Sequence, residues 1–233
     1  MNAPLSLMNS ESAHGRSAQA GPRDECSRAA SAEDIRVLSK IYNDDINIAL
    51  WHRGDRCPDI EATRALIDVA PNLAVNSVTT PDKACADIER ALPRQYSGTL
   101  AEDIAELSEM FCVLFDLKRV GLRLTALEKA MCPRFHVDAV PCRLVTTYCG
   151  QGTQWLHHAS VDRSKLGRGS RGLPDSESGV YGQASDIQNA QSGDVALLKG
   201  EAWVGNEGVG LVHRSPAISH GEKRLLLTLD FAS

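Results

Sequence analysis

The sequence predicts an α+β protein in which a helical N-terminal half packs on a C-terminal β-core. Before Lys118, apolar residues recur at helical spacing, most clearly at Leu100, Ile104, Leu107, Phe111 and Leu114, which share one helix face. After Lys118, short apolar runs are separated by glycine and proline, which is typical of an all-β sandwich or barrel. The two patterns meet without a linker, so we expect a single domain over residues 31–233.

The mainly helical part is expected at 31–118, after a tail at 1–30 that we expect to be disordered. The tail is rich in Ser, Ala, Gly, Asn and Arg and has no hydrophobic period. Capping signals then predict helix starts at Ser31–Asp34, at Thr80-Pro81 and at Thr99 with Glu102. A further helix is expected at Asp59–Val69 and a strand at Ile46–Trp51.

The β-core is expected at 119–233. Its predicted extended runs are Val120–Thr125, Arg134–Val140, Arg143–Tyr148, Asp194–Leu198, Gly210–His213 and Arg224–Phe231. Between them, residues 157–192 form a long polar stretch. Stretches of this length without structure of their own are usually lids, binding loops or disordered segments.

Charge and hydropathy narrow the classes of partner. The formal net charge is −5, which gives no electrostatic case for nucleic acid or an anionic membrane. No apolar run reaches the ~18–20 residues of a membrane span. The first residues lack the pattern of a secretory signal. There are seven cysteines, an odd number, and none of them forms a CxxC pair, so we expect reduced thiols and no disulfide framework. We therefore expect a cytoplasmic protein.

A candidate metal site begins at Arg134-Phe135-His136-Val137-Asp138. In an extended chain, residues i and i+2 point to the same side, so His136 and Asp138 can address one point. His213 can add a second imidazole from elsewhere in the fold. Two histidines and one carboxylate make the facial triad of a non-haem Fe(II) site. Taken alone, the pair is also compatible with an edge-strand histidine and a turn aspartate.

Arg224 begins the apolar strand Leu225–Phe231, eleven residues after His213. A buried charge without a partner is costly, and the guanidinium fork is suited to a carboxylate. Either a bound carboxylate that also reaches the metal, or an ordinary Asp or Glu of this chain, can be that partner.

The ordered set of HxD, the Gly193-Asp194 turn with its apolar strand, His213 and Arg224 resembles the Fe(II)/2-oxoglutarate-dependent dioxygenases, over roughly residues 120–231. The resemblance implies a double-stranded β-helix core of the cupin-like jelly-roll type. It implies that His136, Asp138 and His213 hold Fe(II), and that Arg224 binds the distal carboxylate of 2-oxoglutarate. It further implies a hydroxyl from Tyr148 or Thr146 at that carboxylate, and Gly152-Thr153 is similar to a segment that often follows that strand.

The chain also resembles a bacterial family classed as a domain of unknown function, over most of residues 40–231. The segments that carry this resemblance are Cys132–Asp138, Gly152–Leu156, Gly193–Gly200 and His213–Pro216. Some members are thought to be encoded beside zinc-responsive genes, which hints at zinc limitation and at no particular reaction.

Other candidates are weaker. Arg134, Arg143, Trp155 and Arg214 flank the motifs and could contact a small-molecule or protein substrate, or could have a solvated or stacked surface role. The cysteines around HxD match no compact zinc spacing. His157-His158 is more typical of a solvated pair, and serine-hydrolase and P-loop motifs do not occur.

Three functions remain open at this point. The first is an Fe(II)/2-oxoglutarate-dependent oxygenase that hydroxylates a substrate the sequence does not name. The second is a cupin-like metal-binding or sensing protein in zinc or metal homeostasis, without oxygenase activity. The third is a β-sandwich binding module in which HxD is incidental. Iron, zinc and manganese are not distinguished by these ligand types alone.

Overall fold

The computed structural model describes residues 28–96 and 98–232. The tail expected at 1–30 lies outside these residues, except at its end, where Ala29 and Ala30 already belong to a strand. In the described residues the strands form two sheets. The larger has seven strands in the order β1-β2-β8-β5-β10-β4-β3, and the smaller has three in the order β7-β6-β9.

The strands of the larger sheet are β1 (Ala29–Ala32), β2 (Ile48–Trp51), β3 (Ala74–Thr79), β4 (Val120–Leu127), β5 (Cys142–Cys149), β8 (Val195–Lys199) and β10 (Arg224–Phe231). Those of the smaller sheet are β6 (Gln154–Leu156), β7 (Ile187–Asn189) and β9 (His213–Arg214). Except for the parallel pair β1–β2, all the pairings are antiparallel.

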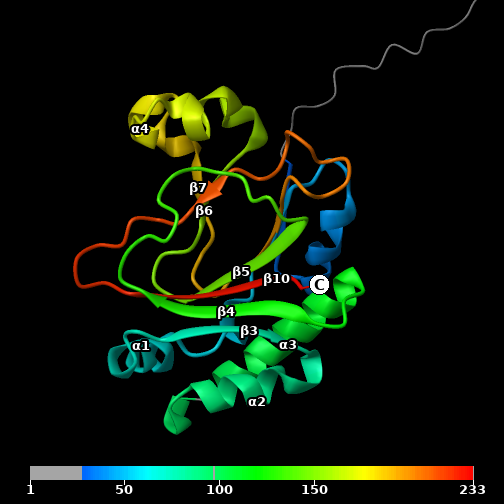
Figure 1. The fold of residues 1–233 in the computed structure, drawn as a ribbon, viewed down its shortest axis with the longest axis vertical. Coiled ribbons are helices and arrows are strands. Elements are labelled where there is room, and N and C mark those ends of the chain that lie inside the picture. Colours follow the sequence, from blue (N-terminus) through cyan, green and yellow to red (C-terminus); the bar gives the residue numbers. More distant parts are fainter. Residues whose placement is uncertain (1–27, 97, 233) are drawn as a thin grey trace, which may run out of the picture.

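Three helices cover one face of the larger sheet: α1 (Ile60–Val69), α2 (Pro81–Ala91) and α3 (Gly98–Phe115) (Figure 1). Asp59 caps α1 by accepting a hydrogen bond from the backbone N–H of Glu61, and proline begins α2. The 3₁₀ helix η1 (Ile35–Tyr42) is capped by Asp34. Each predicted helix is therefore present within a few residues. No helix in the described part of the chain has both the length and the apolar character needed to cross a membrane.

The N-terminal part is not a helical half. It supplies β1, β2 and β3 to the larger sheet, so helices and strands are mixed before Lys118. The strand expected at Ile46–Trp51 is present as β2, whereas β3 was not predicted. β3 is an edge strand in which exposed and half-buried residues alternate up to the buried Thr79, and it is held by its pairing with β4. Such a strand carries little local signal, because its stability comes from the neighbour.

The central strands of the larger sheet are apolar on both faces. Leu144, Leu225 and Leu227 pack towards the helices together with Phe111 of α3. The alternate residues Val145 and Leu226 pack in a second cluster with Trp155 and Leu211, on the side of the smaller sheet. Burial on both faces explains why these strands have continuous apolar sequences. We call this second side the inner face, because it lies between the two sheets.

Residues 157–192 are not a structureless loop. They contain the 3₁₀ helices η4 (His158–Ser160), η5 (Arg163–Lys165), η6 (Gly167–Ser170) and η7 (Ala184–Asp186), the short helix α4 (Asp175–Ser178) and strand β7. Two further 3₁₀ turns lie earlier in the chain, η2 (Gly54–Arg56) and η3 (Arg94–Tyr96). In Figure 1 the part around α4 lies beyond the smaller sheet, on the side away from α1–α3. It is anchored by Val180, which packs with Phe135, Leu156 and Val212.

Candidate metal centre

His136 and His213 lie directly opposite each other in an antiparallel bridge. The backbone N–H of each donates to the carbonyl of the other, and both N···O distances are 3.0 Å. Residues paired in this way present their side chains to the same face. The two imidazole rings consequently lie 4.6 Å apart, centroid to centroid, on the inner face.

Asp138 joins the two histidines, as the i, i+2 spacing predicts. Its Oδ1 lies 3.6 Å from Nε2 of His136, and its Oδ2 lies 3.4 Å from Nε2 of His213. The three possible ligand atoms are all within 4.8 Å of one another. Among the residues that the structure describes, this is the one group of three or more His, Cys, Asp or Glu side chains that could hold a metal ion.

The other ring nitrogen of each histidine contacts a backbone carbonyl. Nδ1 of His136 is 2.9 Å from the Arg134 carbonyl, and Nδ1 of His213 is 3.2 Å from the Leu211 carbonyl. A carbonyl only accepts, so Nδ1 carries the proton and donates. Nε2 of each ring faces Asp138: it donates to the carboxylate when the ring is protonated, and it can bind a metal when the ring is neutral.

Arg143 holds the carboxylate of Asp138 from β5. Its Nη1 is 2.6 Å from Asp138 Oδ2, and its Nε is 2.7 Å from Asp230 Oδ1. Burial acts to raise the pKa of Asp138, but hydrogen bonds from His136 and His213 and the charge of Arg143 outweigh it and hold this pKa well below its usual range. The hydrogen bond to Asp138 raises the pKa of His136. Arg143 was a candidate for substrate contact or for a surface role; the structure gives it two carboxylate partners within the chain.

Asp175 of α4 connects the residues that flank the two histidines. Its Oδ1 accepts from Nε of Arg134 at 2.9 Å. Its Oδ2 accepts from Nη1 of Arg214 and from the backbone N–H of Phe135, both at 2.9 Å. Arg214 directly follows His213, so in an extended chain its side chain points to the opposite side from that imidazole. Arg134 is held by its hydrogen bond to Asp175. The structure therefore does not bring Arg134 and Arg214, two predicted substrate contacts, to the metal site.

Arg224 is buried on the inner face without a carboxylate partner. Only 1% of its surface is exposed, and its partners are hydroxyls. Nη2 donates to Thr147 Oγ1 at 2.9 Å and to Thr153 Oγ1 at 3.0 Å, and Nε lies 3.2 Å from Thr147 Oγ1. No ion pair joins Arg224 to any acidic side chain in the described ranges. Desolvation lowers its pKa to about 10.

Thr146 and Tyr148 lie on the other face of β5, so the structure corrects their predicted role beside Arg224. The Tyr148 hydroxyl donates to Asp103 Oδ2 at 2.6 Å. Arg53 completes a buried network, with Nη1 2.6 Å from Asp103 Oδ1 and Nη2 3.4 Å from Thr146 Oγ1. Burial raises the pKa of Asp103 and raises that of Tyr148 well above its ordinary value.

The hydroxyls that sequence reasoning missed are those of Thr147 and Thr153. The signal was available, because Thr147 has the parity of Arg143 on β5 and so shares its face. Thr153 belongs to the Gly152-Thr153 segment, which had been noted without a role. Trp155, the fourth predicted substrate contact, does lie on the inner face, directly opposite His213 in the pairing of β6 with β9.

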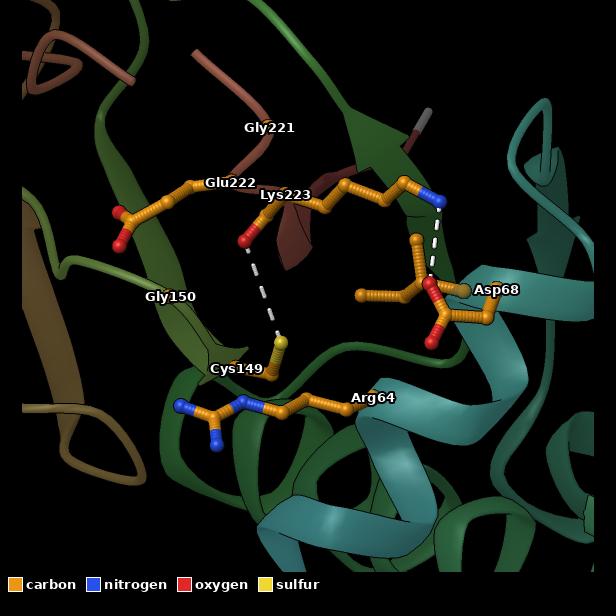
Figure 2. A pocket seen from close by; sticks show the side chains of 8 residues that line it. Arg64, Asp68, Cys149, Gly150, Gly221, Glu222 and Lys223 are labelled. Atoms are coloured by element: carbon orange, nitrogen blue, oxygen red, sulfur yellow. Dashed lines mark hydrogen bonds and ion pairs between the residues drawn. The ribbon is translucent and has the colours of Figure 1, made fainter. Parts of the chain in front are cut away.

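A separate pocket of about 290 Å³ lies on the helix side of the larger sheet. Figure 2 shows Arg64 and Asp68 of α1 facing Cys149 and Lys223, where β5 ends and β10 begins. Nζ of Lys223 forms an ion pair with Asp68 Oδ1 at 3.1 Å. The pocket and the metal centre are therefore on opposite faces of the same sheet.

A protein-family profile described as "Protein of unknown function (DUF1826)" matches residues 32–230. The chain belongs to this family. The resemblance to a family of unknown function, inferred from the motifs, is thus confirmed. The matched residues include His136, Asp138 and His213. No curated protein is similar enough to the chain to count as a match.

The chain is also similar to solved structures of oxygenases. The dioxygenase for auxin oxidation in rice is 12% identical, with 88% of this chain and 82% of that chain covered and a TM-score of 0.49. A putative oxygenase from Shewanella oneidensis is 9% identical (87% and 88% covered, TM-score 0.47). HygX from Streptomyces hygroscopicus, with nickel and 2-oxoglutarate bound, is 14% identical (85% and 86% covered, TM-score 0.43). At these values the likeness concerns the arrangement of the chain, and nothing about the site rests on it.

Proposed function

We propose that this protein is an Fe(II)- and 2-oxoglutarate-dependent oxygenase that hydroxylates a small-molecule or protein substrate. The observation that carries the proposal is Arg224, a buried cation without a carboxylate partner in the described residues, on the same inner face as a His–Asp–His cluster. We assign the two facing sheets to a double-stranded β-helix of the cupin-like type, and a cytoplasmic location remains our expectation.

The donor set fits Fe(II). Two imidazole nitrogens and one carboxylate are the ligands of the facial triad, which leaves open positions for other ligands. Because Nδ1 of each imidazole donates to a backbone carbonyl, the neutral form of either ring presents Nε2 to the metal, as binding requires. His136, Asp138 and His213 would hold the ion. When bound, Fe(II) and 2-oxoglutarate would supply the activation of O₂ that hydroxylation of a C–H bond needs.

The surroundings of Arg224 fit the distal carboxylate of 2-oxoglutarate. Its hydrogen bonds within the chain use Nε and Nη2, which leaves Nη1 for a ligand. Thr147 and Thr153 hold the guanidinium plane in place, and their hydroxyls can each also donate to the bound oxygen. A carboxylate here would provide the countercharge that the protein lacks.

The second candidate is a metal-binding or sensing protein of the cupin-like type in zinc or metal homeostasis. The same donor set favours it, because two histidines and one carboxylate also bind Zn(II). In that case Arg224 has no ligand to bind. Both candidates require the histidines to hold a metal, but only the oxygenase requires Arg224 to bind a carboxylate.

The test measures metal and cosubstrate separately. Protein prepared without oxygen should bind about one Fe(II). Once O₂ is admitted, it should convert 2-oxoglutarate slowly to succinate and CO₂ even without a substrate. His136→Ala or His213→Ala should abolish the bound iron. Arg224→Met should retain the iron and lose 2-oxoglutarate binding. Iron binding with no affinity for 2-oxoglutarate in the unaltered protein would favour the sensing protein, and iron retained by both histidine variants would contradict the site.

A further inference from the structure

The indole N–H of Trp155 is a buried donor without a partner. The residue is 7% exposed, and its Nε1 makes no hydrogen bond within the described part of the chain. Buried side-chain donors are normally paired, and an unpaired one carries a desolvation cost that needs an explanation. A ligand that accepts from this N–H is one explanation, and the position of Trp155 favours it.

Trp155 lies between Arg224 and the metal ligands. It follows Thr153 by two residues, and Thr153 binds Arg224 at 3.0 Å. In an extended chain, a step of two residues covers about 7 Å, and the two side chains point to the same face. Across the sheet, Trp155 is paired with His213, so the two side chains point to the same side. A row of neighbours thus runs from Arg224 through Thr153 and Trp155 to His213.

The indole is held rigidly in this row. Leu226 and Val145 of the larger sheet and Leu211 pack with it in the inner-face cluster, and the ring of His157 lies 4.7 Å from its ring. A side chain packed on these sides cannot turn its N–H to solvent without breaking the cluster. The orientation of the indole is therefore fixed before any ligand binds, so a hydrogen bond from it carries little further entropic cost.

We propose that the indole N–H of Trp155 donates a hydrogen bond to an oxygen of the 2-oxo acid held between Arg224 and the metal ligands. The inference rests on the proposed function and adds a residue that determines ligand specificity. A ligand that binds Arg224 at one end and the metal at the other has to pass this row. A ligand with an acceptor oxygen opposite Trp155 pairs the indole N–H. A ligand with an apolar group at that position leaves the N–H unpaired.

Trp155→Phe is the variant that removes the donor and keeps an aromatic ring in the cluster. Trp203→Phe is the matched control, because Trp203 packs with Tyr42 and Phe115 on the helix side of the larger sheet. Binding of 2-oxoglutarate to the Zn(II)-loaded protein is measured by calorimetry. We expect Trp155→Phe to weaken 2-oxoglutarate binding about tenfold or more, with Zn(II) affinity unchanged and the thermal midpoint lowered by a few degrees for the smaller ring, and the control to bind normally.

A second readout follows the indole N–H itself. The chain has three tryptophans, so ¹⁵N spectra of the Zn(II) form contain three indole signals. The signal of Trp155 is the one that remains unassigned after Trp51→Phe and Trp203→Phe, so it is identified even if Trp155→Phe does not fold. Adding 2-oxoglutarate should shift this signal downfield and slow its exchange with solvent.

The outcomes separate the inference from the function on which it rests. If the unaltered protein binds 2-oxoglutarate while Trp155→Phe binds it equally well, or the indole signal does not move, the role of Trp155 is wrong and the proposed function stands. If the unaltered Zn(II) protein does not bind 2-oxoglutarate at all, both are overturned. Weaker binding by Trp155→Phe together with a shifted signal supports the hydrogen bond.

Discussion

His136 and His213 are a hydrogen-bonded antiparallel pair, each backbone N–H donating to the carbonyl of the other at 3.0 Å. The distance between the two imidazoles is thus set by the backbone and not by a chance meeting of side chains. The substitution of either ring leaves these backbone bonds available. Loss of the metal and loss of the fold should therefore be separable.

The first prediction uses this separation. His213→Ala should reduce bound Fe(II) from about one equivalent to nearly none, because two ligands do not complete the facial triad. The thermal midpoint of the metal-free protein should fall by only a few degrees, since the bridge to His136 persists. His220→Ala is the control, because His220 is exposed and outside the cluster. A metal content that is unchanged in His213→Ala would contradict the assignment.

The second prediction concerns Asp175. Asp175→Asn keeps the shape of the side chain but removes the charge that Arg134 and Arg214 share. We expect a loss of ~1–3 kcal/mol in the free energy of unfolding, less than for a fully buried pair because Arg134 is partly exposed. Because these arginines adjoin the two histidines, Zn(II) affinity should also fall, by about tenfold.

Chemical denaturation and a competitive Zn(II) titration measure both effects of Asp175→Asn. Glu177→Gln is the matched control, since Glu177 lies on the same short helix and is exposed. If Asp175→Asn loses stability while its Zn(II) affinity stays normal, Asp175 supports the fold without positioning the metal ligands.

The third prediction concerns Arg224, whose burial opposes the stability of the ligand-free protein. A pKa lowered from 12.5 to about 10 corresponds to roughly 3 kcal/mol of cost for the charged form. The folded-state pKa of this base is depressed, so the cost applies fully below about pH 10 and is relieved as pH rises above it. Arg224→Met should therefore raise or preserve the free energy of unfolding at pH 7.

Added 2-oxoglutarate should raise the thermal midpoint of the unaltered Zn(II) protein and leave that of Arg224→Met unchanged. The two measurements together distinguish a ligand-binding arginine from a structural one. If Arg224→Met is strongly destabilised without ligand, the residue supports the fold through Thr147 and Thr153, and the proposed carboxylate site loses its main argument.

The fourth prediction contrasts Arg224 with Arg53, the second buried arginine of this region. Arg53 has a full countercharge, because its Nη1 lies 2.6 Å from Asp103 Oδ1. Arg53→Met would leave Asp103 buried with the Tyr148 hydroxyl as its remaining side-chain partner, and should cost about 3–5 kcal/mol in urea denaturation. Equal stability changes for Arg53→Met and Arg224→Met would refute the distinction between a paired and an unpaired buried arginine.

Several features of the site were readable in the sequence because they are local. The spacing of His136 and Asp138 in extended chain implies a common face, and the structure brings their ligand atoms within 4.8 Å of that of His213. The helices α1, α2 and α3 were readable from apolar residues at helical spacing and, for α2, from the proline at its start. The predicted cap Thr99 instead lies inside α3, which begins at Gly98. In these cases the information lies within a few residues of the element itself.

Other features depended on contacts that local patterns do not carry. The sequence left the flanking arginines between substrate contact and a surface role, whereas Arg134 and Arg214 meet Asp175 some forty residues away in the chain. Thr146 and Tyr148 were predicted beside Arg224 in place of Thr147. Strand parity shows that Thr147 shares the face of Arg143, but only the sheet order shows that Arg224 lies on that face. The segment 157–192 was expected to be a loop, since its short elements are held by packing and not by periodicity.

By itself, the sequence of this DUF1826 member determined which residue types could form a metal centre, and that a positive charge would enter an apolar strand at Arg224. Only the tertiary structure decided that this charge has no carboxylate partner in the described residues, whereas Arg134, Arg143 and Arg214 have one. The physical reason is that hydrogen bonds and ion pairs between distant segments depend on strand register and sheet order. These arise from the burial of whole faces and not from the spacing of residues along the chain.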